Sequence, residues 1–397
     1  MSTRPDRVTF PSHTGQQLSG RLVYPVGQPA GVALFAHCFT CGKDLGSAVR
    51  VSKELARRGF LVMRFDFTGL GESEGDFADT TFSSNIEDLV AAAAWLRDTH
   101  SAPSVLVGHS LGGAAVLCAA QQIKEVRAVA TIGAPSDPSH VTHLLADDIE
   151  TIERDGEATV SLAGRPFQVR QAFLDDVRQQ SLVGHIAKMN AALLVLHSPQ
   201  DVTVGIDNAR QIYEAARHPK SFVTLDGADH LLSRRQDAAY VGEVVAAWAS
   251  RYLPAREKPK RAIHSDDVEV YAGPSGFVNQ VVARSHHWMA DEPLEIGGTD
   301  AGPTPYEHLL AALGTCTTMT MRMYADRKKW PVQDITVHLR HSKKRDENGK
   351  AVDHIRREIH IEGDLSDEQR VRMLDIADRC PVHRTLHAEV VVTTAEV

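Results

Sequence analysis

A serine in a glycine-flanked turn is the first residue of this chain that could do chemistry. Ser110 lies in the segment Gly108–Gly112, GHSLG, between an apolar run and a stretch of small residues. Glycines on both sides of a serine permit a sharp strand-to-helix turn that exposes the hydroxyl. The spacing therefore predicts Ser110 as a nucleophile.

Two later segments supply the partners that a serine nucleophile needs. Asp201 and His230 each follow an apolar run of strand length. We predict that His230 removes the Ser110 proton as a general base. Asp201 would orient the imidazole and stabilise its cation. Asp229, directly before the histidine, is the alternative acid.

A negatively charged oxygen forms at the attacked carbonyl and needs two backbone N–H donors. Leu111, directly after the nucleophile, is one predicted donor, and Phe39, in the loop after the run Val32–Ala36, is the other. Cys38 and Cys41 give the same loop a C-x-x-C pair. We interpret it as a plain loop, and a redox gate is the alternative.

The elements that must position these residues follow from the apolar pattern. Runs of strand length recur through the first 250 residues, with amphipathic helical patterns between them; they lie at 21–24, 32–36, 60–65, 105–107, 129–132, 193–196 and 222–225. This alternation predicts a mostly parallel sheet with helices on both faces. Loops leaving the carboxyl ends of parallel strands meet at one edge, where we expect Ser110, Asp201 and His230. Residues 138–190 break the rhythm and are predicted to form a small cap.

These features together resemble the α/β-hydrolase family over residues 1–253. The resemblance rests on GHSLG, Asp201, His230, the loop His37–Phe39 and the segment Asp66–Ser73. It implies the α/β-hydrolase fold and a serine hydrolase, and we predict a carboxylesterase acting on small or medium acyl esters. Cys38 stands where relatives usually have glycine.

Composition bounds the remaining possibilities. The 397 residues are enough for two domains, and 43% hydrophobic with 24% charged residues is typical of a globular protein. A net charge of −8 gives no basic excess for nucleic acid, and no apolar stretch approaches a membrane span. The amino terminus lacks an apolar secretory segment, so we expect a cytoplasmic protein whose five cysteines are mostly thiols. No cofactor is predicted.

A charged, proline-bearing stretch, 254–263, is the predicted linker to a second domain, 264–397. Strands there alternate apolar with polar residues, which favours an antiparallel sheet with one wet face. Two helices are predicted, at about 305–327 and about 367–379. The first is so apolar that we expect it to be buried on all sides.

This second domain resembles the OsmC/Ohr family through Gly302–Pro305, Cys316 and Cys380. The resemblance implies an α+β fold, a homodimer and a thiol peroxidase. The Cys316 thiolate would attack an organic hydroperoxide and become a sulfenic acid, Cys380 would resolve it as a disulfide, and a dithiol reductant would reset the pair. Relatives have a glutamate directly after the proline, where this chain has Tyr306.

Other charged residues are candidates to act on Cys316. Glu307 follows Tyr306, but on a continuous helix it lies about 180° from Cys316. The candidate charges for stabilising the thiolate are Arg284, His383 and Arg384. Cys380, His383 and His387 have a C-x2-H-x3-H spacing, and with Cys316 they form an alternative zinc site, although we predict no metal. Cys118, in the helical stretch after Ser110, is predicted to be core.

The sequence therefore predicts a serine esterase fused to an OsmC-like thiol peroxidase that also dimerises the chain. Its partners would be an ester, an organic hydroperoxide and a dithiol, with no nucleic acid or membrane. One alternative is an esterase whose second domain only dimerises the protein. The other is a ligand or redox sensor with negligible turnover.

Overall fold

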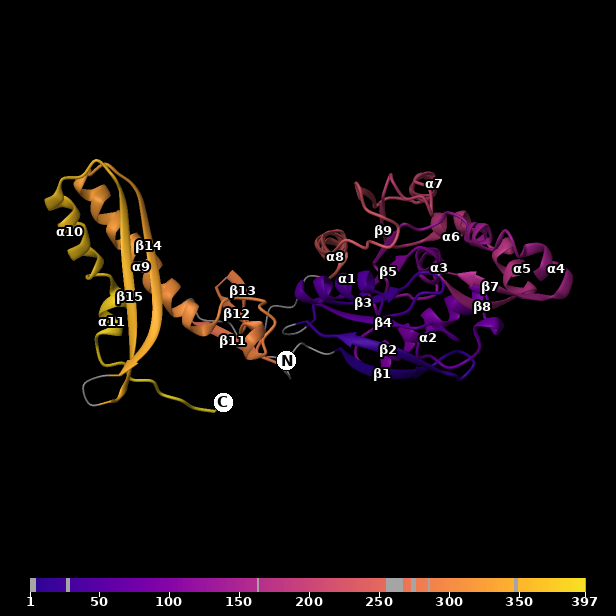
Figure 1. The fold of residues 1–397 in the computed structure, drawn as a ribbon, viewed down its shortest axis with the longest axis horizontal. Helices are drawn as coiled ribbons and strands as arrows, with labels where there is room; N and C mark the ends of the chain where they lie inside the picture. The colour runs from indigo at the N-terminus through magenta and orange to yellow at the C-terminus, as the bar shows by residue number, and fades with distance from the viewer. Residues whose placement is uncertain are drawn as a thin grey trace. The chain divides into compact units, whose positions relative to one another are not determined.

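A computed structural model describes most of the chain and divides it into two compact units, which we describe separately. The first unit spans 3–275 and the second 276–397 (Figure 1). The described residues are 5–25, 29–162, 164–254, 267–272, 276–284, 286–345 and 349–396. Apart from Pro254, the predicted linker 254–263 lies outside them.

The first unit is built on an eight-stranded sheet of order β1-β2-β4-β3-β5-β6-β9-β10. Its strands are β1 (Asp6–Pro11), β2 (Gln17–Val23), β3 (Gly31–Ala36), β4 (Phe60–Phe65), β5 (Val105–His109), β6 (Ala128–Ile132), β9 (Ala192–His197) and β10 (Lys220–Thr224). From β4 to β10 every pairing is parallel, whereas β1 and β2 are antiparallel additions. The predicted parallel sheet is confirmed, although sequence reasoning missed β1.

Helices cover both faces of this sheet. One core packs against α2 (Phe82–Thr99), α3 (Leu111–Ala119) and α7 (Asp207–Ala215), and the opposite core packs against α1 (Gly46–Arg57) and α8 (Arg235–Ala249). Successive strand residues alternate between them, so Leu34 lies in the first core and Phe35 in the second. Short 3-10 turns, η1 (Phe77–Asp79) and η3 (Ser250–Tyr252), complete the unit.

The cap region, 138–190, forms a small subdomain between β6 and β9. It holds η2 (Pro138–Leu145), α4 (Ile149–Asp155), β7 (Glu157–Leu162), β8 (Arg165–Arg170), α5 (Gln171–Gln179) and α6 (Leu182–Lys188). The predicted helical pattern is confirmed, because α5 buries Phe173, Leu174 and Val177. The antiparallel hairpin β7–β8 was not foreseen.

The second unit pairs long strands with helices. Its elements are β12 (Asn279–Ala283), β13 (His286–Ala290), η4 (Leu294–Ile296), α9 (Pro305–Lys328), β14 (Val332–Arg345), β15 (Ala351–Gly363), α10 (Asp367–Ala377) and α11 (Pro381–Leu386). Strand β11 (Val268–Ala272) precedes them in the chain and falls within the range of the first unit. Pairs β12–β13 and β14–β15 are antiparallel, as predicted. Helix α9 packs against β14, α10 and α11.

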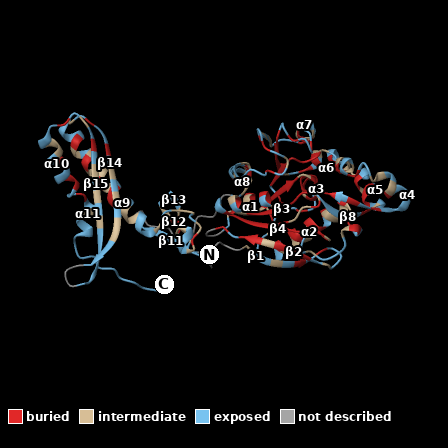
Figure 2. Ribbon diagram, in the orientation of Figure 1, coloured by how far each residue is buried: buried red, intermediate tan, exposed pale blue. Residues whose placement is uncertain are grey.

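The expectation that this apolar helix is buried on all sides is wrong. Met321 and Ala325 of α9 are fully buried, but Met319 and Met323 are 64% and 73% exposed. In a single chain, β14, α10 and α11 cover only one stripe of the helix. Figure 2 shows the contrast, with buried strands in the first unit and mostly exposed surface in the second. None of the helices in the described ranges combines the length and apolarity needed to cross a bilayer.

Candidate functional site

Ser110 sits at a strained turn between β5 and α3. Its backbone has φ 55° and ψ −126°, a conformation that costs free energy for any residue with a side chain. A Cβ at Gly108 would lie 2.4 Å from the carbonyl oxygen of Gly112, and a Cβ at Gly113 would lie 2.6 Å from Cβ of Ala134. The turn therefore closes only because these positions are glycine.

The serine meets the histidine and aspartate that the sequence singled out. Ser110 Oγ lies 3.0 Å from Nε2 of His230, and His230 Nδ1 lies 2.7 Å from Oδ2 of Asp201. Asp201 follows β9 and His230 follows β10, so both reach the carboxyl edge of the sheet. The arrangement allows a proton to pass from the serine to the imidazole while the carboxylate faces the other ring nitrogen.

Backbone N–H groups hold the acid in its charged form. Thr203 and Val204 each donate to Oδ1 of Asp201 at 2.9 Å. Burial raises the pKa of Asp201, but the hydrogen bonds from His230 and these two N–H groups outweigh it and keep the pKa below its ordinary value. Asp229 instead accepts the N–H of Ser233 at 2.7 Å. The structure thus sets Asp201, and not Asp229, against the imidazole.

Two buried histidines that sequence reasoning passed over support this geometry. His109 donates from Nε2 to the carbonyl oxygen of His230 at 2.7 Å, and His197 donates from Nε2 to that of Val204 at 2.8 Å. Burial lowers the pKa of His109 to about 4 and also lowers the pKa of His197. Both rings are therefore neutral at pH 7 and hold the loops that carry the base and the acid. The only sequence signal was their place beside predicted site residues.

The loop after β3 lies against the start of α3. A Cβ at Gly112 would lie 2.3 Å from the carbonyl oxygen of His37, so the loop backbone packs directly on the first helical turn. The N–H groups of Phe39 and Leu111 donate to no acceptor within the described part of the chain. A cavity of about 10 Å³, room for one water-sized group, is lined by residues that include these two. Both N–H groups are therefore free to donate to an oxyanion.

The plain loop predicted at Cys38 and Cys41 holds no free thiols. The two cysteines form a disulfide that brackets Phe39 and Thr40. Thr40 adopts φ 59°, and this left-handed residue turns the chain so that the two Cα atoms lie 5.3 Å apart. The spacing showed the pair, but the turn that closes it is visible only in the structure.

A cluster of aromatic rings joins the cap to this loop. Phe39 stacks on Phe173 of α5 with ring centroids 5.3 Å apart and also contacts Phe77 at 5.6 Å. Phe77 meets Phe167 of β8 at 5.0 Å. Arg165, also on β8, donates to the carbonyl oxygen of Thr40. The surroundings of Phe39 are therefore apolar and are built partly by the cap.

The two cysteines singled out in the second unit both bond to backbone N–H groups at the start of α11. Cys316 Sγ, on α9, accepts the N–H of Val382 at 3.5 Å, and Cys380 Sγ accepts the N–H of His383 at 3.3 Å. Both are free thiols; Cys316 is partly exposed and Cys380 fully buried.

The position of the expected glutamate is used differently in this chain. Tyr306 stacks on His341 with ring centroids 4.1 Å apart. Glu307 Oε2 accepts the N–H of Thr304 at 2.7 Å and caps α9. Neither contact involves Cys316, so the Glu307 carboxylate is bonded away from the sulfur.

A different cation lies near the thiols. Arg357 of β15, which sequence reasoning missed, donates to Oγ1 of Thr317 at 3.0 Å, and that oxygen lies 3.7 Å from Cys380 Sγ. Arg284 and Arg384 make no hydrogen bond to either sulfur among the described residues. Of the alternative zinc ligands, His383 and His387 have ring centroids 4.4 Å apart, with the rings tilted by 39°. Within the described ranges, no group of three His, Cys, Asp or Glu residues is arranged to hold a metal ion.

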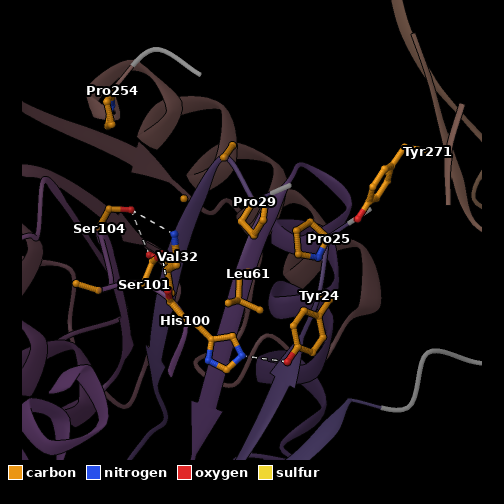
Figure 3. Close-up of a pocket in the computed structure, with 13 residues that line it drawn as sticks. Tyr24, Pro25, Pro29, Val32, Leu61, His100, Ser101, Ser104, Pro254 and Tyr271 are labelled. Atoms are coloured by element: carbon orange, nitrogen blue, oxygen red, sulfur yellow. Dashed lines mark hydrogen bonds between the residues drawn. The ribbon is translucent and has the colours of Figure 1, made fainter. Parts of the chain in front are cut away.

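A larger pocket of about 600 Å³ lies at the opposite edge of the first unit's sheet. Val32 and Leu61, near the amino ends of β3 and β4, line it together with Ser104, which precedes β5. Tyr24 Oη and His100 Nε2 lie 3.1 Å apart at its wall (Figure 3). The pocket is therefore separate from the edge that carries Ser110. Cys118 is buried as predicted, and burial raises the pKa of its thiol to about 12.

Comparisons with known proteins agree with this division. Residues 34–201 match the model of the alpha/beta hydrolase fold family, and residues 298–395 match that of OsmC-like proteins. The solved esterase domain of a Rhodothermus marinus protein is 48% identical over 63% of this chain and 99% of its own length, with a TM-score of 0.53.

Curated relatives match the same part of the chain. The mitochondrial palmitoyl-protein thioesterase ABHD10 of Mus musculus is 28% identical over 198 residues, 48% of this chain and 65% of that protein. The chain thus spans just under two thirds of that relative's length. The monoacylglycerol lipase of Mycolicibacterium smegmatis is 22% identical over 59% of this chain and 94% of that protein.

Proposed function

Because the chain belongs to the alpha/beta hydrolase fold family and carries an OsmC-like domain later in the sequence, we propose that it is a serine carboxylesterase joined to a thiol peroxidase. We name the two parts the hydrolase module, the first unit, and the OsmC-like module, the second. The esterase proposal rests on one observation above all: Ser110 Oγ, His230 and Asp201 are linked by contacts of 3.0 and 2.7 Å.

The proposed acylation step uses each of these groups. His230 Nε2 takes the proton as Ser110 Oγ attacks the ester carbonyl carbon. The carbonyl oxygen becomes an oxyanion and accepts hydrogen bonds from the N–H groups of Phe39 and Leu111. When the tetrahedral intermediate collapses, His230 returns the proton to the leaving alcohol. A water activated by His230 then attacks the acyl-serine and releases the acid in the same way.

The substrate is proposed to be an ester of a small or medium acyl group. The aromatic cluster of Phe39, Phe77 and the cap residues Phe167 and Phe173 suits an apolar acyl or alcohol group. The relatives named as esterase, lipase and thioesterase support acyl transfer as the reaction class.

The OsmC-like module is proposed to reduce organic hydroperoxides. The Cys316 thiolate would attack the peroxide O–O bond, forming a sulfenic acid and releasing an alcohol after proton uptake. The Cys380 thiol would then condense with the sulfenic acid, releasing water and forming a disulfide that an external dithiol reduces. Support comes from the two free thiols, which accept N–H groups of neighbouring residues at the start of α11. The exposed stripe of α9 supports a homodimer through this module.

One observation favours a second candidate for this module. Glu307 caps its own helix and Tyr306 stacks on His341, so neither lies against Cys316. Without a carboxylate there, the OsmC-like module would serve only to dimerise two esterases.

A substrate panel separates these functions. Wild type, Ser110→Ala and Cys316→Ser would be assayed for hydrolysis of short and medium p-nitrophenyl esters, and for consumption of an organic hydroperoxide with a dithiol. We expect Ser110→Ala to lose only hydrolysis and Cys316→Ser to lose only hydroperoxide consumption. Wild-type hydrolysis without hydroperoxide consumption selects the dimerisation role. If wild-type ester hydrolysis is slow and is unchanged in Ser110→Ala, the esterase proposal is refuted and the sensor alternative is favoured.

A further inference from the structure

We propose that the buried ion pair of Lys43 and Asp66 is a positioning device for the oxyanion loop, which we define as residues 37–43. It would act on acyl transfer through the Phe39 N–H, without touching the substrate. The inference rests on the proposed esterase function and adds two residues to Ser110, His230 and Asp201.

Asp66, directly after β4, grips the end of the oxyanion loop with both carboxylate oxygens. Oδ1 accepts the backbone N–H of Lys43 at 2.6 Å, and Oδ2 lies 2.5 Å from Lys43 Nζ. Oδ2 also accepts the N–H of Glu72 at 2.9 Å. One carboxylate therefore ties the loop backbone, the lysine side chain and the turn after β4 together.

Lys43 is held from every side. It is only 1% exposed, and its ammonium also contacts Oε2 of Glu72 at 2.8 Å. Arg64 of β4 donates from Nε to the Lys43 carbonyl oxygen at 2.6 Å. The N–H, the carbonyl and the side chain of this residue are thus all fixed to β4 and the turn that follows it.

The surrounding backbone is shaped to the carboxylate. Gly71 adopts φ 58°, and a Cβ at this position would lie 2.1 Å from Asp66 Oδ2. Gly42 also lies close, since its Cβ would be 3.2 Å from Oδ1. Burying two charges costs several kcal/mol per ion, and apolar replacements for such pairs are often equally stable. Stability alone is therefore a poor explanation for this pair, whereas fixing a loop position explains its geometry.

The position being fixed is the one that catalysis needs. The Cys38–Cys41 disulfide closes the middle of the oxyanion loop, and the carbonyl of His37 packs on Gly112 at its start. The Lys43–Asp66 pair fixes its end, so the Phe39 N–H lies between held points. An oxyanion donor works at about 2.7–3.1 Å from the oxygen, and an error of about 1 Å can cost roughly 100-fold in rate.

The test is Asp66→Asn in the full chain, assayed with a short p-nitrophenyl ester. In asparagine one of the two acceptor oxygens becomes an NH2 group, so at least one of the donors that bond to Asp66 loses its acceptor and the end of the loop must shift. We expect kcat to fall roughly 10- to 100-fold while KM changes less than about twofold. Inhibition by a trifluoromethyl ketone, which forms an oxyanion on Ser110, should weaken by the same factor as kcat.

A matched control is Asp88→Asn. Asp88 is an equally buried carboxylate that accepts the N–H of Thr68 at 2.9 Å and its hydroxyl at 3.1 Å, outside the oxyanion loop. It should leave kcat within about twofold. If Asp66→Asn does not fold, Lys43→Met serves instead; it keeps the backbone bond to Asp66 and should lower kcat several-fold.

Three outcomes overturn the proposal: unchanged kcat and inhibitor affinity in the Asp66 or Lys43 variant, an equal loss in Asp88→Asn, or a loss confined to KM. Failure of the esterase proposal itself gives a different result: the Ser110→Ala variant would then hydrolyse the ester as fast as the wild type.

Discussion

The hydrolase module and the OsmC-like module hold their reactive side chains in different ways. In the hydrolase module, Ser110, His230 and Asp201 contact one another, and the backbone around them is fixed by buried groups such as His109. In the OsmC-like module, the partly exposed Cys316 lies on a helix with one uncovered side.

This difference indicates how much each site needs from outside its own chain. The hydrolase site is assembled by contacts within one chain. The OsmC-like module leaves apolar side chains in water, including Met319 and Met323 on α9 and the run Val390–Val392, whose residues are 59–82% exposed. Apolar surface of this kind is typical of a face that another protein covers. We infer that hydrolysis needs one chain and that the thiol chemistry needs two.

The largest expected effect is on the acid of the hydrolase site. Asp201→Asn should lower kcat for ester hydrolysis roughly 10³- to 10⁴-fold, because an amide neither stabilises the imidazolium nor holds the correct tautomer. Asp229→Asn, one residue from His230, should stay within about twofold, since Asp229 caps a local turn instead. Steady-state kinetics with an activated ester measures both.

Hydroperoxide consumption by Asp201→Asn should match the wild type, because the two chemistries use separate residues. Equal losses of hydrolysis in the two aspartate variants would contradict the assignment of Asp201.

The second prediction concerns the uncovered side of α9. Met323→Glu places a charge on the proposed dimer face, so the protein should become monomeric and hydroperoxide consumption should fall about tenfold or more. Ester hydrolysis should not change. Sedimentation velocity and the two activity assays check this result. Val183→Glu on α6, which is also an exposed apolar position, is the matched control and should alter neither quantity. A monomeric variant with full hydroperoxide consumption would remove the contrast between the modules.

A smaller effect is expected from the Cys38–Cys41 disulfide. Closing a loop this short restricts the chain by an entropy worth on the order of 2 kcal/mol. Reduction by a dithiol should therefore loosen the loop that carries Phe39 and lower kcat for ester hydrolysis several-fold. The double variant Cys38→Ser/Cys41→Ser should show the lower kcat from the start and no response to dithiol. A dithiol response that persists in the double variant would assign the effect to another cysteine.

For the hydrolase module, the sequence predicts much of the fold and of the site. Fully buried strands give continuous apolar runs, and the glycines at 108 and 112 mark the turn because no other residue fits. The Lys43–Asp66 pair and the neutral His109 could not be found this way. Each depends on a contact between segments far apart in the chain, and a histidine or lysine in a sequence looks the same whether it is buried or exposed.

The OsmC-like module shows a different limit. Helices α9 and α10 and the antiparallel strands were predicted by apolar periodicity, but the short helix α11 and the one-sided burial of α9 were not. Apolar composition shows that a helix needs cover without showing whether its own chain provides it. Met321 is covered by the same chain and Met323, half a turn away, is not.

The smallest effect should appear in the pH dependence of stability. The pKa of His109 lies at about 4 in the folded protein, against an ordinary value of 6.5. Between these values the unfolded chain binds a proton that the folded chain does not. The free energy of unfolding should therefore fall as pH decreases from 6.5 towards 4, by about 1.4 kcal/mol per pH unit for this one group. Urea denaturation of the full chain at pH 7 and pH 5 measures the slope.

His109→Gln isolates this contribution. Its side-chain amide can still donate to the carbonyl oxygen of His230, but it does not titrate. The buried His37 and His197, whose pKa values are also lowered by burial, remain in the variant and keep the sign of the slope. The variant should therefore lose stability on acidification less steeply than the wild type, by the equivalent of about one proton. Equal slopes would mean that His109 takes up its proton in the folded protein, and the neutral ring that holds the His230 loop would then be the wrong description.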